Sequence, residues 1–94
     1  MILKEGNKLR YEVLFPKSVR KELDKINDVY YSKICSKINE MEQNPRLIGS
    51  IKLSDSDEYR IIVGVYRILY EINDIEKKVY IYKIDHRKDI YKKR

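Results

Sequence analysis

The sequence predicts an α+β fold in which an N-terminal strand and a helical hairpin precede an antiparallel three-strand meander, with the helices against one face of the meander. Apolar and polar side chains alternate with period two between residues 9 and 15 and again from Glu58 to Ile84, which is typical of strands. Between these stretches the apolar residues lie three and four apart, which is typical of amphipathic helices. A chain of 94 residues exposes too much surface to support two cores, so residues 1–94 are expected to form a single domain.

The first strand is short, and its apolar members are Leu9, Tyr11, Val13 and Phe15. Pro16 ends this strand. From Lys17 the apolar spacing becomes helical, which predicts a short helix that stops near Asn27.

A second helix is expected from Asp28, whose side chain is suited to cap the helix N-terminus. Its apolar stripe consists of Tyr30, Ile34, Ile38 and Met41. Asn44 precedes Pro45 and therefore disfavours helical geometry, so the helix is expected to end there. The two helices should form a hairpin.

Residues 46–57 are expected to form a loop that contains a short apolar piece, Ile51 to Leu53. An antiparallel meander follows, with strands at Glu58 to Val63, Tyr66 to Asn73 and Lys78 to Ile84. Gly64 and Val65 form a two-residue turn with glycine first, as a type II′ turn requires.

This turn predicts where the side chains of the first hairpin point. If Val63 pairs with Tyr66, Arg60 and Arg67 project from one face as diagonal neighbours, roughly 7–8 Å apart at the backbone. Both guanidinium groups can then reach one phosphodiester. The opposite face, expected in the core, carries Tyr59, Tyr66 and Tyr70.

The second hairpin brings the basic tail to the same place. If the turn after Asn73 pairs that residue with Lys78, Ile84 lies opposite Arg67 and the chain leaves the sheet beside the arginines. The sequence thus predicts one pocket formed by Arg60, Arg67, His86, Arg87 and Tyr91. The simpler interpretation is that each arginine is solvated or paired with an acid, such as Glu58 or Glu71.

Composition narrows the classes of partner and site. There are 21 Lys and Arg against 15 Asp and Glu, which gives a net charge of +6 and favours nucleic acid or an acidic protein as partner. Five basic residues and one acid lie between Arg87 and Arg94; the alternative for this stretch is a solubilising tail. One Cys and one His argue against a disulfide within the chain and against a transition-metal site, so neither metal nor cofactor is expected.

The chain shows no signal for membrane insertion or export. The longest apolar run, Val79 to Tyr82, is far too short to span a bilayer, and the start, MILKEG, lacks the apolar region of a signal peptide. We therefore expect a cytoplasmic protein without membrane contact.

Over nearly its whole length the chain resembles toxins of the RelE/ParE superfamily, and in particular the RelE branch. The usual pattern of that branch is Tyr-Arg-x-Arg-x-Gly-x-Tyr-Arg-x-x-Tyr-x-Ile, then a strand and His-Arg-x-x-x-Tyr. This chain matches it at Tyr59, Arg60, Gly64, Tyr66, Arg67, Tyr70, Ile72, His86, Arg87 and Tyr91.

The resemblance implies two helices packed on a twisted, mainly antiparallel sheet. It implies the toxin of a type II toxin–antitoxin pair that cuts mRNA on the ribosome and is neutralised by a RelB-like antitoxin on a separate, acidic chain. It also implies that the scissile phosphate is bound and activated by Arg60, Arg67, Arg87 and Tyr91, with His86 as a further member. Other basic residues expected to contact RNA or the ribosome are Lys52, Lys83, Lys88, Lys92, Lys93 and Arg94.

Metal-free RNA cleavage needs proton transfer as well as charge stabilisation. Arginine stays protonated, so His86 and Tyr91 are the candidate proton carriers. The chain departs from the family at Ile62, where a second basic residue is common; Lys52 or Lys83 is a candidate substitute. This departure leaves two alternatives open: a ParE-like toxin that inhibits gyrase, and an RNA-binding module that does not cleave.

Overall fold

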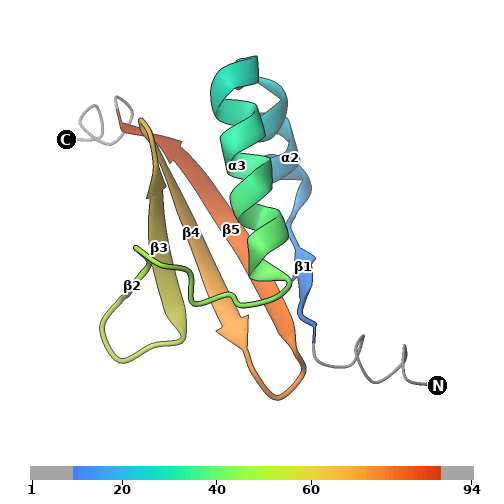
Figure 1. Ribbon diagram of the computed structural model, residues 1–94, viewed down its shortest axis with the longest axis vertical. Coiled ribbons are helices and arrows are strands. Elements are labelled where there is room, and N and C mark those ends of the chain that lie inside the picture. The colour runs from blue at the N-terminus through green and yellow to red at the C-terminus, as the bar shows by residue number, and fades with distance from the viewer. Residues whose placement is uncertain (1–9, 88–94) are drawn as a thin grey trace.

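The computed structural model describes residues 10–87, which form a five-stranded sheet with two helices on one face (Figure 1). The strand order is β1-β5-β4-β3-β2; β1 runs parallel to β5, and the other neighbours are antiparallel. This confirms the predicted α+β fold. The elements are β1 (Glu12–Leu14), α2 (Lys17–Asp24), α3 (Asp28–Met41), β2 (Ile51–Lys52), β3 (Glu58–Val63), β4 (Tyr66–Asn73) and β5 (Lys78–His86).

The core lies between the helices and the face of the sheet that they cover. From α3 it receives Ile34 and Met41, both fully buried, as the predicted apolar stripe requires. Tyr59 and Tyr70 are buried, and Tyr66 packs against the core at its edge, which confirms the face predicted for the three tyrosines. The remaining core side chains are Val19, Leu23, Leu47, Ile61, Val63, Ile68, Ile72, Val79, Ile81 and Ile84.

The helical hairpin differs from the prediction at its ends. α2 stops at Asp24, before the expected Asn27, and α3 ends at Met41, before Asn44. The cap of α3 is Asn27, whose side-chain oxygen accepts a hydrogen bond from the backbone N–H of Tyr30 at 3.4 Å, so the assignment of Asp28 as the cap is wrong. Asp28 lies instead in the first turn, where its negative charge interacts favourably with the positive end of the helix dipole.

The strands β3 and β4 have the predicted bounds, whereas β5 continues past the expected end to His86. Ile51–Lys52 forms an edge strand on β3 where a loop was expected. Pairing with β3 satisfies backbone groups of this piece, and its two side chains are both exposed.

The β3–β4 turn has the predicted geometry. Gly64 has φ of 62°, and Val63 pairs with Tyr66, so the register is the predicted one. A side chain at Gly64 would also overlap the ring of Tyr30 on α3. Glycine is thus required both by the backbone and by the close approach of the helix.

A β-bulge interrupts the β4–β5 pairing. From the turn as far as Tyr70, which pairs with Ile81, the register is the expected one. The next residue back along β4, Leu69, pairs with Lys83, so Tyr82 is an extra residue in β5.

The bulge changes which residue faces Arg67. The partner is Asp85, so the expectation that Ile84 lies opposite Arg67 is wrong. Burial supplies the physical reason: Ile84 is in the core, whereas uninterrupted pairing would place Lys83 beside Ile68 on the covered face.

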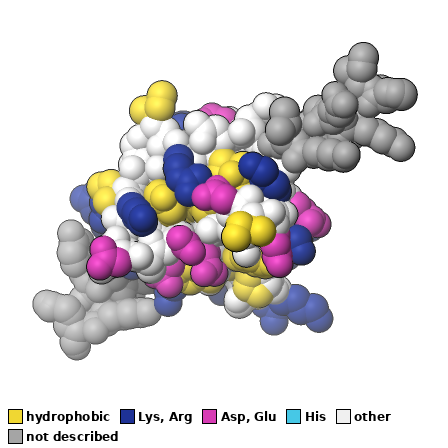
Figure 2. Space-filling view, turned by 90° about the horizontal axis from the view of Figure 1, so that it is seen from below, with side chains coloured by type: hydrophobic (Ala, Val, Ile, Leu, Met, Phe, Trp, Pro, Cys, Tyr) yellow, Lys and Arg dark blue, Asp and Glu magenta, His cyan; other side chains and the backbone are white. Residues whose placement is uncertain are grey.

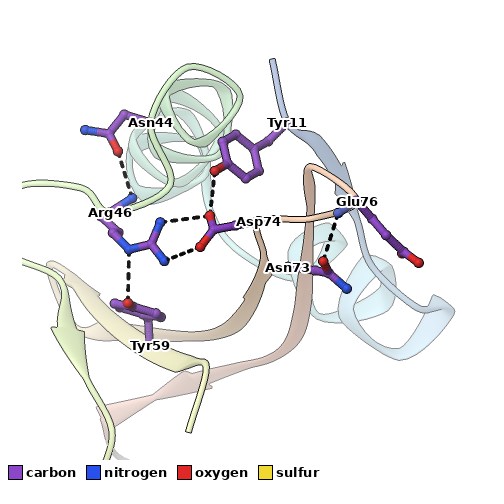
Figure 3. A network of polar contacts seen from close by, with 7 residues as sticks. All are labelled: Tyr11, Asn44, Arg46, Tyr59, Asn73, Asp74 and Glu76. Carbon is purple, nitrogen blue, oxygen red and sulfur yellow. Dashed lines mark hydrogen bonds and ion pairs between the residues drawn. The ribbon is translucent and has the colours of Figure 1, made fainter. Parts of the chain in front are cut away.

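A polar network lies at the end of the sheet that carries the β4–β5 turn (Figure 3). Arg46, in the loop after α3, makes two hydrogen bonds to Asp74 in the β4–β5 turn, at 2.8 and 3.1 Å, and donates from Nε to the hydroxyl of Tyr59 at 3.1 Å. The Tyr11 hydroxyl donates to the same carboxylate at 2.6 Å. Hydrogen bonds from Arg46 and Tyr11 lower the pKa of Asp74 to about 2. The network joins four segments that are distant in sequence.

The surface at that end has mixed charge. Figure 2 shows Lys and Arg side chains interspersed with Asp and Glu, with apolar side chains between them. Among residues 10–87 no helix is both long and apolar enough to cross a membrane.

Asp74→Asn should lower the free energy of unfolding by about 1 kcal/mol at pH 6, a modest effect because the carboxylate is half exposed to screening solvent. The pKa of Asp74 is depressed in the fold, so its contribution is present above the unfolded value near 4 and is lost as the pH falls toward 2. The free energies of unfolding of wild type and Asp74→Asn, measured by urea titration between pH 6 and pH 2, should therefore become equal as the pH falls.

Asp55→Asn is the matched control, since Asp55 is an exposed aspartate with no ion pair to any residue between 10 and 87. A difference between wild type and Asp74→Asn that stays constant down to pH 2 would contradict the role given to this network.

Candidate functional site: the open face of the sheet

The face of the sheet opposite the helices, here called the open face, carries the predicted arginines. No helix within residues 10–87 covers it. Its side chains alternate with those of the core along each strand. They include Glu58, Arg60 and Ile62 of β3, Arg67, Leu69 and Glu71 of β4, and Tyr80, Tyr82, Lys83 and Asp85 of β5.

Arg60 and Arg67 share the open face, as the register predicted. Arg60 lies opposite Leu69, and Arg67 lies opposite Ile62, so the two arginines are diagonal neighbours on adjacent strands. Lys83, on the far side of Leu69 from Arg60, adds a third cation.

Asp85 is the counter-ion of this group. Its Oδ2 lies 2.8 Å from Nη2 of Arg67, and its Oδ1 lies 3.8 Å from Nζ of Lys83. The carboxylate is buried, at 8% exposure, and it faces two cations at once. The acid beside Arg67 is therefore Asp85, and not Glu58 or Glu71 as the simpler interpretation supposed. We call Arg60, Arg67, Lys83 and Asp85 the arginine cluster.

The arginine cluster retains unused capacity to bind an anion. Within residues 10–87 Arg60 makes no ion pair, and the Nε atoms of Arg60 and Arg67 are both buried without a hydrogen-bond partner. Burying an unpaired donor costs about 1–3 kcal/mol. The cluster holds three cations and one carboxylate, so it keeps an excess of positive charge that an anion between the cations would relieve.

His86 lies on the other face. It pairs with Tyr66 at the end of β5, and the two rings meet edge to face with centroids 5.0 Å apart. Tyr66 in turn contacts Tyr30 of α3 at 5.5 Å. The expected pocket is thus wrong in one respect, because the bulge and the alternation of β5 place His86 beside the helices rather than beside Arg67.

The other predicted residues are distributed as follows. Arg87 is exposed beside the β3–β4 turn, where its backbone N–H donates to the carbonyl of Val65 at 2.7 Å. Lys52 pairs with Tyr59 and so belongs to the opposite face from Arg60, which leaves Lys83 as the one of the two candidate substitutes for the missing cation that lies on the open face. Outside the described residues lie Lys88, Tyr91, Lys92, Lys93 and Arg94.

Sequence reasoning missed Asp85, although β5 contains a signal for it. The core residues Val79 and Ile81 are two apart, whereas Ile81 and Ile84 are three apart. A single break of this kind in a period-two pattern marks a bulge, and a bulge here predicts Asp85 opposite Arg67.

The sequence also matches a known family over most of its length. A family model described as "ParE toxin of type II toxin-antitoxin system, parDE" matches residues 13–91. Toxin RelG of Mycobacterium tuberculosis is 27% identical over 85 residues, which cover 88% of this chain and 98% of that protein. The chain belongs to the RelE/ParE superfamily of type II toxins. Its relatives by sequence and structure place it with the RelE-type members.

Solved RelE structures have the same fold as this RelE-type toxin. A chain of the archaeal RelE–RelB complex from Pyrococcus horikoshii OT3 is 30% identical with a TM-score of 0.77, and the match covers 83% of this chain and 96% of that one. A chain of the RelB–RelE complex from Methanococcus jannaschii is 30% identical with a TM-score of 0.68, covering 84% and 95%. The two helices on an open sheet are therefore the architecture of the family.

In this toxin Asp85→Asn should change both the stability of the fold and its affinity for a polyanion. It leaves Arg67 without its counter-ion at a largely buried position, so we expect the free energy of unfolding to fall by about 1–3 kcal/mol. Binding to a heparin column should become tighter, because one negative charge has left the arginine cluster. Lys83→Met, which removes a longer and more exposed contact, should change stability by less than about 1 kcal/mol and weaken heparin binding. Heparin elution of Asp85→Asn at the wild-type salt concentration would contradict this account.

Proposed function

We propose that this RelE-type toxin is a ribosome-dependent endoribonuclease that cleaves mRNA through the RNA's own 2′-hydroxyl. The 2′-hydroxyl gives its proton to a base as its oxygen bonds to the adjacent phosphorus, the bond from phosphorus to the 5′-oxygen breaks, and the leaving 5′-oxygen takes up a proton. The products are a 2′,3′-cyclic phosphate and a 5′-hydroxyl. The observation that carries the proposal is the pair of arginines on the open face, adjacent to one another and incompletely neutralised.

In this mechanism the arginine cluster stabilises the negative charge that develops on the phosphorane. Preformed donors aimed at developing charge contribute on the order of 10²–10³ each in rate. Ile62, where the family often has a cation, lies opposite Arg67 and is half exposed. Lys83 shares the face of Arg67 and is therefore the residue that we assign to the missing charge.

Two residues are proposed as proton carriers, His86 and Tyr91. Guanidinium groups cannot act as bases, so the arginines do not suffice. His86 is the last residue of β5, and Tyr91 follows it in the chain. Because His86 packs on Tyr66 on the other face of the sheet from the arginines, its proposed role requires the RNA to pass around the end of β5.

An antitoxin is the proposed protein partner. The solved relatives from Pyrococcus horikoshii and Methanococcus jannaschii are complexes of RelE with RelB. We propose that a RelB-like chain, acidic and partly disordered before binding, wraps this toxin and neutralises its net charge of +6.

Arg67→Ala and Arg60→Ala should each abolish growth arrest on induced expression. Each change removes one donor to the developing charge, so cleavage of translated mRNA, followed by primer extension, should fall by roughly 10²–10³. Arg20→Ala is the matched control, because Arg20 is an exposed arginine on α2, away from the open face. Full toxicity of both open-face variants would exclude the proposed site.

Ile62→Arg should raise the cleavage rate, by roughly tenfold, because it adds a cation opposite Arg67. Its cost in stability should be small, since the Ile62 side chain is 53% exposed. Ile48→Arg, at a side chain that is 97% exposed in the loop after α3, controls for a general gain in charge. Equal rates for Ile62→Arg and wild type would show that Lys83 already supplies that charge or that the position does not act in cleavage.

A second candidate function is inhibition of DNA gyrase. Two observations favour it: the matching family model is that of ParE toxins, and an apolar side chain occupies position 62. This candidate predicts double-strand DNA breaks while translation continues, whereas the nuclease predicts cut mRNA and arrested translation. Salt-sensitive RNA binding without cleavage on ribosomes would instead indicate a binding module.

A further inference from the structure

The open face has a second half whose chemistry differs from that of the arginine cluster. One row of cross-strand neighbours consists of Glu58, Glu71 and Tyr80 on β3, β4 and β5. Tyr82, the bulge residue, lies between this row and the arginine cluster. The half therefore combines two carboxylates with two aromatic rings, and we call it the tyrosine–carboxylate patch.

The tyrosines of this patch are exposed where aromatic side chains are usually buried. Tyr80 is 36% exposed and Tyr82 is 40% exposed, on the face that no helix within residues 10–87 covers. The bulge makes this possible for Tyr82, because it turns both Tyr82 and Lys83 toward solvent. Bulges commonly redirect a side chain next to a functional site.

Tyr82 is also held in one orientation. Its hydroxyl donates a hydrogen bond to Oε1 of Glu58 at 3.2 Å. Since β4 lies between β5 and β3, the side chain of Tyr82 must reach across β4 to do so. Partial burial and the charge of Glu58 raise the pKa of the Tyr82 hydroxyl. A fixed, exposed ring is a suitable surface for stacking.

The two carboxylates are placed unfavourably for stability alone. Glu58 and Glu71 lie directly opposite one another, and like charges in that arrangement destabilise a sheet. Within residues 10–87 neither makes an ion pair. They repel phosphate, but they accept hydrogen bonds from amino groups.

We propose that the tyrosine–carboxylate patch is a nucleobase subsite for single-stranded RNA, in which a base stacks on Tyr82 and its exocyclic amino group donates to Glu58 or Glu71. The inference rests on the proposed function, because it places the base next to a phosphate held by the arginine cluster. Arg60 and Glu58 are two residues apart on β3, about 7 Å, so the two groups are neighbours on one face.

Charge distinguishes this ligand from an acidic protein segment. An acidic antitoxin would be attracted by the arginine cluster and repelled by Glu58 and Glu71. RNA suits both halves, because its phosphates are anionic and its bases have uncharged faces with amino donors. Adenine, cytosine and guanine carry such a donor and uracil does not, so the subsite should discriminate against uracil.

The test is binding of fluorescent oligo(A) and oligo(U) decamers to the free toxin, by anisotropy, in the absence of ribosomes. Wild type should prefer oligo(A). Tyr82→Ala should weaken oligo(A) binding roughly 5- to 100-fold, whereas Tyr82→Phe, which keeps the ring, should stay within about threefold of wild type. Glu71→Gln and Glu58→Gln should narrow the preference for oligo(A) over oligo(U).

Tyr31→Ala is the matched control, because Tyr31 is also 36% exposed but lies on α3. It should bind both oligonucleotides like wild type. The proposal is overturned if Tyr82→Ala binds oligo(A) like wild type, or if wild type binds oligo(A) and oligo(U) equally. It is also overturned if Tyr82→Ala loses affinity for the antitoxin and none for RNA.

The same variants separate this inference from the proposed function. Cleavage of mRNA on ribosomes that depends on Arg67 and not on Tyr82, with unchanged RNA affinity in Tyr82→Ala, would overturn the subsite and leave the nuclease in place. Binding of oligo(A) that depends on Tyr82, with no mRNA cleavage on ribosomes, would support the subsite and overturn the nuclease.

Discussion

The two-residue turn at Gly64 and Val65 determines which side chains lie on the open face and which form the core. It sets the β3–β4 register, and a shift of one residue would place Arg60 and Arg67 on opposite faces of the sheet and would likewise separate Tyr59 from Tyr70. Tyr30 of α3 packs so closely on Gly64 that the helix and the turn constrain each other. The same turn therefore fixes both where α3 lies on the sheet and which face of the sheet stays open.

Sequence patterns were sufficient where a single local rule applies. The bounds of β3 and β4, their register and the burial of their tyrosines all follow from alternation and a turn that requires glycine. The predicted register of β5 was wrong because it assumed unbroken alternation along the whole strand. Keeping Lys83 out of the core requires one extra residue in β5. The placements of Asp85 and His86 both depend on that one irregularity.

Other features could not be predicted because they have no local period. Arg46, Asp74 and Tyr11 come from three segments and meet only in the folded chain, and no spacing rule indicates that they are partners. The edge strand at Ile51–Lys52 has too few residues to show alternation. The choice of Asn27 over Asp28 as a cap is a one-residue difference between two side chains that are both good caps.

Asp85 gives the arginine cluster an occupant of its own. The carboxylate of Asp85 already lies 2.8 Å from the guanidinium of Arg67. A phosphate that binds Arg67 must therefore displace this carboxylate or share Arg67 with it, so binding exchanges one anion for another. Under the proposed function, affinity for RNA is then the difference between two ion pairs, and the departing product is displaced by a group that never leaves the protein. Such an internal competitor favours turnover over tight binding, and it keeps a strongly basic protein from adhering equally to every polyanion that it meets.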